Sequence, residues 1–128
     1  EYPQIFISID TYSSVVAASA VQAGADLIND ISAGEMDAAM LPTAARLQVP
    51  YIAMHMQGTP ETMQQNPVYD NVTRQVIDFF IQKNEAFQKA GIKDVILDPG
   101  FGFGKTIEHN FQLLNELDAF GIFHQPLM

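Results

Sequence analysis

The chain has 128 residues, of which 48% are hydrophobic and 16% are charged, a composition typical of one ordered globular domain. Six basic and fifteen acidic side chains give a formal charge of −9, which argues against nucleic-acid binding because that depends on lysine and arginine. The lack of cysteine excludes disulfides and cysteine-ligated zinc. No apolar run approaches the ~20 residues of a membrane helix, so we expect a cytoplasmic protein without a membrane partner.

Short apolar stretches and longer helical segments alternate along the chain. The predicted strands are 5–10, 25–30, 49–55 and 94–98. Their nearly continuous apolar character is typical of parallel strands covered on both faces. The predicted helices are 15–23, 38–47, 71–91 and 107–120. Asn71 and Thr106 are expected N-caps, and Gly24 and Gly91 are expected to end helices.

This β/α order predicts a parallel sheet with right-handed crossovers in a single domain, residues 1–128. The pattern leaves two architectures open: a doubly wound open sheet, or part of a (β/α)₈ barrel. Four units are half of such a barrel, and residues 121–128 could begin a fifth strand. Residues 56–70 form the one long loop, and long loops in compact domains are often functional.

Polar side chains end every predicted strand, where both architectures collect their chemistry. They are Asp10, Asn29 with Asp30, His55 and Asp98. Strand alternation predicts which side chains share a face: Ser8 with Asp10, Leu27 with Asn29 and Ile31, Met54 with Met56, and Ile96 with Asp98.

Two of these polar residues have competing interpretations, and a third is favoured for function. Asp30 could equally bind a ligand or cap the following helix. Asp10 is favoured for a ligand, because the Thr and Ser residues that follow it can cap the helix themselves. His55 lies between two methionines, but without further soft donors a copper site is disfavoured. We interpret His55 as a hydrogen-bonded structural histidine.

The stretch DPGFGFGKT, residues 98–106, looks like a phosphate-binding loop but does not match one. The P-loop pattern needs a glycine where Pro99 stands, and the dinucleotide pattern needs a glycine where Lys105 stands. We interpret the glycines as a turn that lets backbone and Phe103 approach a flat ligand closely. Lys105 and Thr106 are expected to open the next helix.

Four segments together carry a resemblance to a known family. They are SIDTY (8–12), AGADLINDIS (23–32), YIAMHMQGTPETMQ (51–64) and LDPGFGFGKTIEHN (97–110). In order and spacing, across nearly the whole chain, they resemble dihydropteroate synthase of the folate pathway, a family targeted by sulfonamides. The resemblance implies a partial (β/α)₈ TIM barrel, the central half of a pterin-binding barrel, with about the third to sixth strands.

The resemblance also implies a transferase activity. Such an enzyme joins 4-aminobenzoate to 6-hydroxymethyl-7,8-dihydropterin diphosphate and releases 7,8-dihydropteroate and diphosphate, assisted by Mg²⁺. The family's pterin pocket corresponds here to Asp10, Asn29, Ile31, Met54, Asp98 and Phe103. Asp98 would accept two parallel bonds from the pterin's planar donor pair, and Asn29 would donate and accept along the same edge. Asp10 would bind the remaining ring nitrogens, and the apolar members would contact the ring faces.

Other parts of that family have no counterpart in this sequence, which looks cut from a longer one. This sequence lacks the family's first two strands, which carry the loop asparagine that holds Mg²⁺. It also lacks the last two strands, which carry the cations that bind pterin and diphosphate. We therefore assign no catalytic or metal-binding residue here and expect the isolated chain to be inactive. Ala33 stands where the family often has glycine. We expect the parent enzyme to be a homo-oligomer.

Two other functions remain open from the sequence. One is the pterin-binding domain of a methyltetrahydrofolate–corrinoid methyltransferase, which shares the barrel and the strand-end Asp and Asn residues. The MHMQGTP and DPGFGFGKT segments favour the synthase over this alternative. The other is non-enzymatic: a half-barrel that associates with itself through its open sheet edges.

Overall fold

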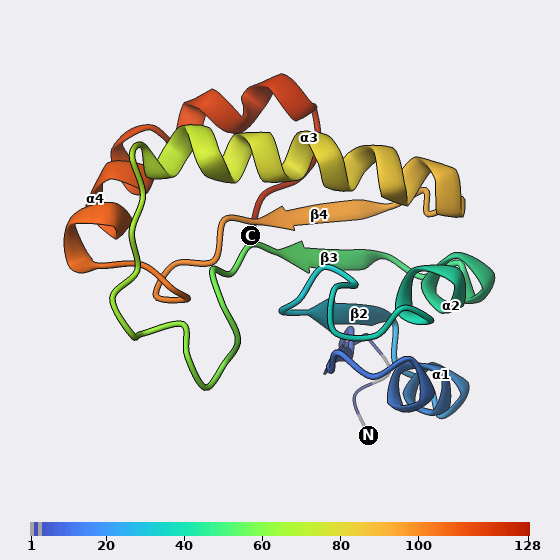
Figure 1. The fold of residues 1–128 in the computed structure, drawn as a ribbon. Helices are drawn as coiled ribbons and strands as arrows, with labels where there is room; N and C mark the ends of the chain where they lie inside the picture. Colours follow the sequence, from blue (N-terminus) through green and yellow to red (C-terminus); the bar gives the residue numbers. More distant parts are fainter. Residues whose placement is uncertain (1, 3) are drawn as a thin grey trace.

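The computed structural model describes residue 2 and residues 4–128. Within them, strands and helices alternate as predicted (Figure 1). The elements are β1 (Ser8–Asp10), α1 (Ser14–Gln22), β2 (Leu27–Asp30), α2 (Met40–Leu47), β3 (Tyr51–Met54), α3 (Val72–Ala90), β4 (Val95–Asp98), α4 (Ile107–Asn115) and the 3₁₀ helix η1 (Leu117–Phe123). All paired strands are parallel, in the order β1-β2-β3-β4.

The strand order decides between the two architectures that the sequence left open. A doubly wound sheet reverses its strand order and carries helices on both faces. Here each strand pairs with the next one in the chain, and right-handed crossovers then place every connecting helix on one face. Successive helices also contact one another in chain order. A parallel bridge from Leu97 to Leu127 continues the sheet beyond β4, as expected for a fifth strand.

The main core lies between the sheet and these helices. Side chains on the helix-covered face of the strands are fully buried, among them Ile28, Tyr51, Ala53 and Leu97. The face of α3 formed by Val72, Val76, Phe80 and Phe87 is buried as well, as predicted. In Figure 1, α3 runs along β4 and covers this side of the sheet. Burial on this scale supplies most of the folding free energy.

The predicted helix ends are confirmed. Asn71 accepts a hydrogen bond from the Arg74 N–H at 2.8 Å, and Gly91 ends α3 with a φ of +88°. Thr106 caps α4 by accepting from the His109 N–H at 3.2 Å. The predicted strands begin too early, because ladder pairing starts only at Ser8, Leu27, Tyr51 and Val95.

The predicted helix 107–120 is wrong in its second half. The α-helix ends at Asn115, and a 3₁₀ helix follows from Leu117 to Phe123. Residues three apart share a side of a 3₁₀ helix, which turns Phe120 and Phe123 toward the Phe80 ring, at centroid distances of 6.4 and 6.1 Å. This aromatic contact favours the tighter helix.

None of the helices in the described part of the chain is both long and apolar enough to cross a membrane.

Candidate functional site

Strand register brings the predicted site residues onto one face of the sheet. Asp10 is the partner of Asn29 across β1 and β2, and Met54 is the partner of Asp98 across β3 and β4. Register partners in parallel strands point the same way. These four side chains therefore lie on the face opposite the helices, at the carboxyl ends of the strands. Roughly 10 Å, two strand spacings, separate the Asn29 and Asp98 strands.

Asn29 carries an unused hydrogen-bonding atom on this face. Its Oδ1 is buried and has no hydrogen-bond partner among the described residues. A buried amide oxygen normally finds a donor, and leaving it unpaired costs about 1–3 kcal/mol. The neighbouring Asp10 is exposed. A ligand with N–H groups that lay across β1 and β2 could satisfy both side chains.

Asp98 is half-buried and only partly engaged. Its Oδ1 accepts a hydrogen bond from the Gly100 N–H at 2.8 Å, and no bond of its Oδ2 is found among the residues described. Burial raises the pKa of Asp98, while the Gly100 hydrogen bond and the nearby Lys105 ammonium lower it. The open carboxylate oxygen can accept a further N–H donor.

Two of the predicted apolar residues line the same small hollow. Ile31 and Met54 border it together with Met36, Met56 and Phe79 from the loops and α3. Phe79 was not predicted, and its place beside the buried Phe80 on an amphipathic helix gave no cue in the sequence. Phe103 does not line this hollow. It lies half-buried on the glycine-rich loop, where its N–H donates to the Gly100 carbonyl at 3.1 Å.

The prediction for Lys105 is wrong, because this residue does not open a helix. Its side chain is folded inward, and the residue is only 4% exposed. Its Nζ lies 3.0 Å from His55 Nδ1, 3.2 Å from the His55 carbonyl, 2.9 Å from the Gly100 carbonyl and 3.0 Å from the Phe103 carbonyl. Burial lowers the pKa of Lys105 to about 8. A lysine directly after a glycine run, with no acidic residue beside it, was the available sequence cue.

His55 has the structural role that the sequence predicted. It is buried and packs edge-on against the Phe79 ring, at a centroid distance of 4.9 Å. Burial, reinforced by the Lys105 charge, lowers the pKa of His55 to about 3. The neutral imidazole then accepts at Nδ1 from the Lys105 ammonium.

Asp30 is neither a ligand nor the cap of α2. It is fully buried on the helix-covered face. Its carboxylate accepts hydrogen bonds from the Ser32 N–H at 2.8 Å, the Ser32 hydroxyl at 2.7 Å, the Gly34 N–H at 2.8 Å and the Tyr51 hydroxyl at 2.7 Å. Burial raises the pKa of Tyr51, which keeps its hydroxyl a donor. Asp30 therefore fixes the turn after β2.

The long loop 56–70 follows the carboxyl end of β3 and the glycine-rich loop 98–106 follows the carboxyl end of β4, in green and orange in Figure 1. Gln64 donates to the Gly102 carbonyl, and the Tyr69 hydroxyl donates to the Gly104 carbonyl at 2.9 Å. A Cβ at Gly104 would lie 2.6 Å from the Gln57 carbonyl oxygen. These contacts hold the two loops against each other.

The described residues do not fit a metal site. They contain no group of three or more His, Cys, Asp or Glu side chains placed to hold a metal ion. The Mg²⁺ that the family resemblance implies is usually held by one or two carboxylates together with substrate phosphates, so we assign it no ligand among these residues.

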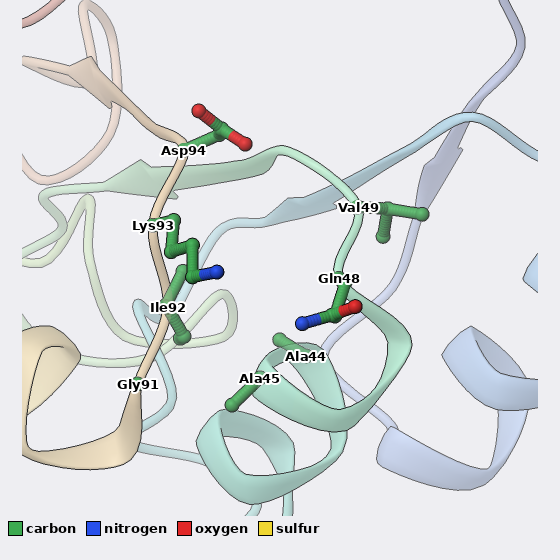
Figure 2. Close-up of a pocket in the computed structure, with 8 residues that line it drawn as sticks. All are labelled: Ala44, Ala45, Gln48, Val49, Gly91, Ile92, Lys93 and Asp94. Carbon is green, nitrogen blue, oxygen red and sulfur yellow. The ribbon is translucent and has the colours of Figure 1, made fainter.

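A second hollow lies at the opposite end of the strands (Figure 2). It is lined by Ala44, Ala45, Gln48, Val49, Gly91, Ile92, Lys93 and Asp94. These residues surround the amino ends of β3 and β4, whereas the chemistry of parallel barrels takes place at the carboxyl ends. We therefore place the candidate site at the Asp10, Asn29 and Asp98 end.

Comparisons with known proteins identify the family and agree with the fold. A family model described as "Pterin binding enzyme" matches residues 1–128. Dihydropteroate synthase of Haemophilus influenzae is 45% identical over 125 residues, covering 96% of this chain and 45% of that protein. The Escherichia coli K12 enzyme is 42% identical over 127 residues, covering 98% and 45%.

Solved structures give the same result. Dihydropteroate synthase of Yersinia pestis with a sulfonamide drug matches with a TM-score of 0.93 and 40% identity, over 97% of this chain and 46% of that one. The Thermus thermophilus enzyme with 6HMPPP matches with a TM-score of 0.89 and 39% identity, over 96% and 49%. The chain thus spans a little under half the length of these relatives.

Proposed function

We propose, on the premise that the chain belongs to the pterin binding enzyme family, that it supplies most of the pterin site of a dihydropteroate synthase. Its fold is a partial (β/α)₈ barrel of four consecutive β/α units. The enzyme would join 4-aminobenzoate to 6-hydroxymethyl-7,8-dihydropterin diphosphate and release diphosphate. The observation that carries the proposal is the buried Oδ1 of Asn29, which has no hydrogen-bond partner among the described residues and lies on the same face as Asp10 and Asp98.

These residues would recognise the flat pterin ring by its edge. The two carboxylate oxygens of Asp98 would accept two parallel, charge-assisted hydrogen bonds, one from the pterin 2-amino group and one from the adjacent ring N–H. Oδ1 would use the lone pair that the Gly100 N–H leaves available. Asn29 would donate and accept along the same edge of the ring, and Asp10 would bind the remaining ring nitrogens. Ile31, Met54 and Phe103 would contact the ring faces. Their contribution to the rate would be orientation of the pterin for attack by the amine of 4-aminobenzoate.

Two parts of the reaction would depend on residues outside this chain. The described residues contain no group of three or more His, Cys, Asp or Glu side chains placed to hold a metal ion, and the resemblance gives the family's cations for diphosphate no counterpart here. We expect the 128 residues alone to form no dihydropteroate. A measurable rate from the purified chain would contradict this expectation.

The relatives do not favour the corrinoid methyltransferase alternative. The two bacterial relatives above are named dihydropteroate synthase, and two solved relatives are described as complexes with 4-aminobenzoate. That compound is the second substrate of the proposed reaction and has no place in methyl transfer to a corrinoid.

The test is calorimetric titration of the complete polypeptide that carries these residues with 6-hydroxymethylpterin. We expect Asp98→Asn to weaken binding about 10- to 100-fold, the value of a charge-assisted hydrogen bond. Asp94→Asn is the matched control, because Asp94 is an exposed carboxylate just before the amino end of β4. The Asp94→Asn variant should bind 6-hydroxymethylpterin with the wild-type affinity. Equal affinity of wild type and Asp98→Asn would overturn the proposal.

A further inference from the structure

Lys105 stands out among the polar residues because it is buried and no carboxylate of the described residues is in contact with it. Only 4% of the residue is exposed. Its ammonium group has three protons and four acceptors within 3.2 Å: one imidazole nitrogen and the carbonyls of His55, Gly100 and Phe103. A cation also lies unfavourably near a helix N-terminus, and α4 begins at Ile107. A specific arrangement must offset these costs.

That arrangement joins two segments that are far apart in the sequence. The His55 carbonyl follows β3, while the Gly100 and Phe103 carbonyls belong to the loop after β4. The three carbonyl oxygens converge on the Lys105 ammonium. Without a cation between them, their partial negative charges would repel one another. The contact is tight, because a Cβ at Gly100 would lie 2.0 Å from the His55 carbonyl oxygen. Lys105 thus fixes the glycine-rich loop against the end of β3.

The fixed loop carries two residues of the proposed pterin site. The Gly100 carbonyl accepts from Lys105, and the Gly100 N–H donates to Asp98 Oδ1 at 2.8 Å. The orientation of the Asp98 carboxylate therefore depends on a peptide group that Lys105 holds. The Phe103 carbonyl is held directly, at 3.0 Å. The Lys105 charge also favours the ionised form of Asp98 against the effect of burial.

We infer that Lys105 is a positioning residue for pterin binding, one that acts through Asp98 by fixing the glycine-rich loop against His55. This role rests on the proposed function. It differs from the position at the start of the next helix that the sequence suggested, and it assigns the lysine no contact with the ligand.

A double-mutant cycle between Lys105 and Asp98 tests the inference in the complete polypeptide. Lys105→Met keeps the length of the side chain and removes its charge and donors. We expect it to weaken binding of 6-hydroxymethylpterin at least 10-fold on its own. In an Asp98→Asn background the same change should weaken binding less than 3-fold, because residues that act through one another are not additive. A purely structural role for Lys105 would give the same factor in both backgrounds.

Lys105→Gln is the second variant, chosen because its amide can still donate to two carbonyls and should preserve folding if Lys105→Met does not. Lys105→Gln should weaken pterin binding less than Lys105→Met does. Its effect should likewise shrink in the Asp98→Asn background. Val76→Ala is the stability control: Val76 is fully buried on α3 and does not belong to the site. We expect it to lower the unfolding midpoint and leave pterin affinity unchanged.

The outcomes separate the two claims. If Asp98→Asn weakens binding and the Lys105 variants add to it in full, or have no effect, the positioning role is wrong and the proposed function stands. If Asp98→Asn leaves binding unchanged, both are wrong. A ¹⁵N NMR spectrum of His55 gives an independent check: Nδ1 should carry the shift of a hydrogen-bonded acceptor, and that shift should change in Lys105→Gln.

Discussion

The turn after β2, residues 30–34, and the loop after β4, residues 98–104, both begin with an aspartate at the last position of a strand. In each, the carboxylate accepts the backbone N–H two residues further on, at 2.8 Å. In each, a lysine donates to a carbonyl of the turn: Lys83 to Ala33 at 3.0 Å, and Lys105 to Gly100 at 2.9 Å. We refer to them as the β2 turn and the β4 loop; the β4 loop is the first part of the glycine-rich loop 98–106.

The two aspartates differ in the face of the sheet to which they point. Asp30 is a register partner of Ala53, under the helices, and its carboxylate bonds to groups of Ser32, Gly34 and Tyr51. Asp98 is a register partner of Met54, on the opposite face, and one of its oxygens accepts no hydrogen bond from the residues that the structure describes. The same residue at the same strand position is thus structural on one face and available to a ligand on the other. Alternation along the strand decides which.

The largest expected effect on stability is that of Asp30→Asn. The new amide would place N–H groups against buried donors, and such mismatches in a buried network cost about 3–5 kcal/mol of unfolding free energy. Asp98→Asn should change that free energy by less than about 1 kcal/mol, because it removes a carboxylate that burial already disfavours. Urea unfolding measures both. Pterin titration of the folded fraction should show the reverse order, and equal stability losses would contradict the contrast between the faces.

Gly100→Ala should have the next largest effect. A Cβ there would meet the His55 carbonyl oxygen at 2.0 Å, and the φ of +71° is strained for alanine. Overpacking and left-handed strain together cost about 2–5 kcal/mol of unfolding free energy.

Gly102→Ala is the matched control for this prediction. Its φ is +81°, but an added Cβ would meet nothing within 4 Å, so only the strain of about 1–2 kcal/mol remains. Thermal unfolding compares the two variants. Equal losses would show that the close approach to His55 does not constrain the β4 loop.

The third prediction concerns pH and the His55–Lys105 contact. The folded-state pKa of about 3 lies below the ordinary value of 6.5, so the unfolded chain binds more protons between these two pH values. The resulting stabilisation is full above pH 6.5 and is lost as the pH falls toward 3. Between pH 7 and pH 5 the loss from His55 is about 2 kcal/mol. Asp98, whose pKa is raised, opposes it.

His55→Asn isolates this contribution, because asparagine can present an acceptor oxygen near the position of Nδ1 without titrating. Urea unfolding of wild type and variant at pH 7 and pH 5 gives the difference. We expect the variant to lose about 2 kcal/mol less than wild type over this range. Parallel losses in the two proteins would mean that His55 is not kept neutral by its surroundings.

The sequence predicted the β/α order, the parallel pairing and the helix caps, because apolar runs and end residues are local features. It also predicted the shared face of Asn29 and Ile31, which follows from alternation alone. It could not assign Asp30, because its partner Tyr51 is 21 positions away and reaches it only through the fold. It placed Lys105 wrongly for the same reason: the His55 carbonyl that holds it is 50 positions away.

Ala33 in the β2 turn should show the smallest effect. Its φ is +47°, in the left-handed region, yet its side chain is fully buried. Replacing it with glycine relieves about 1–2 kcal/mol of strain, but costs roughly 0.5–1 kcal/mol of chain entropy and about 0.8 kcal/mol for the lost methyl. These contributions nearly cancel, so Ala33→Gly should change the unfolding free energy by less than about 1 kcal/mol, measured by urea unfolding. Gly100→Ala, the reverse exchange in the β4 loop, should cost several times more. A large loss in Ala33→Gly would show that the buried methyl, rather than the Asp30 hydrogen bonds, maintains the β2 turn.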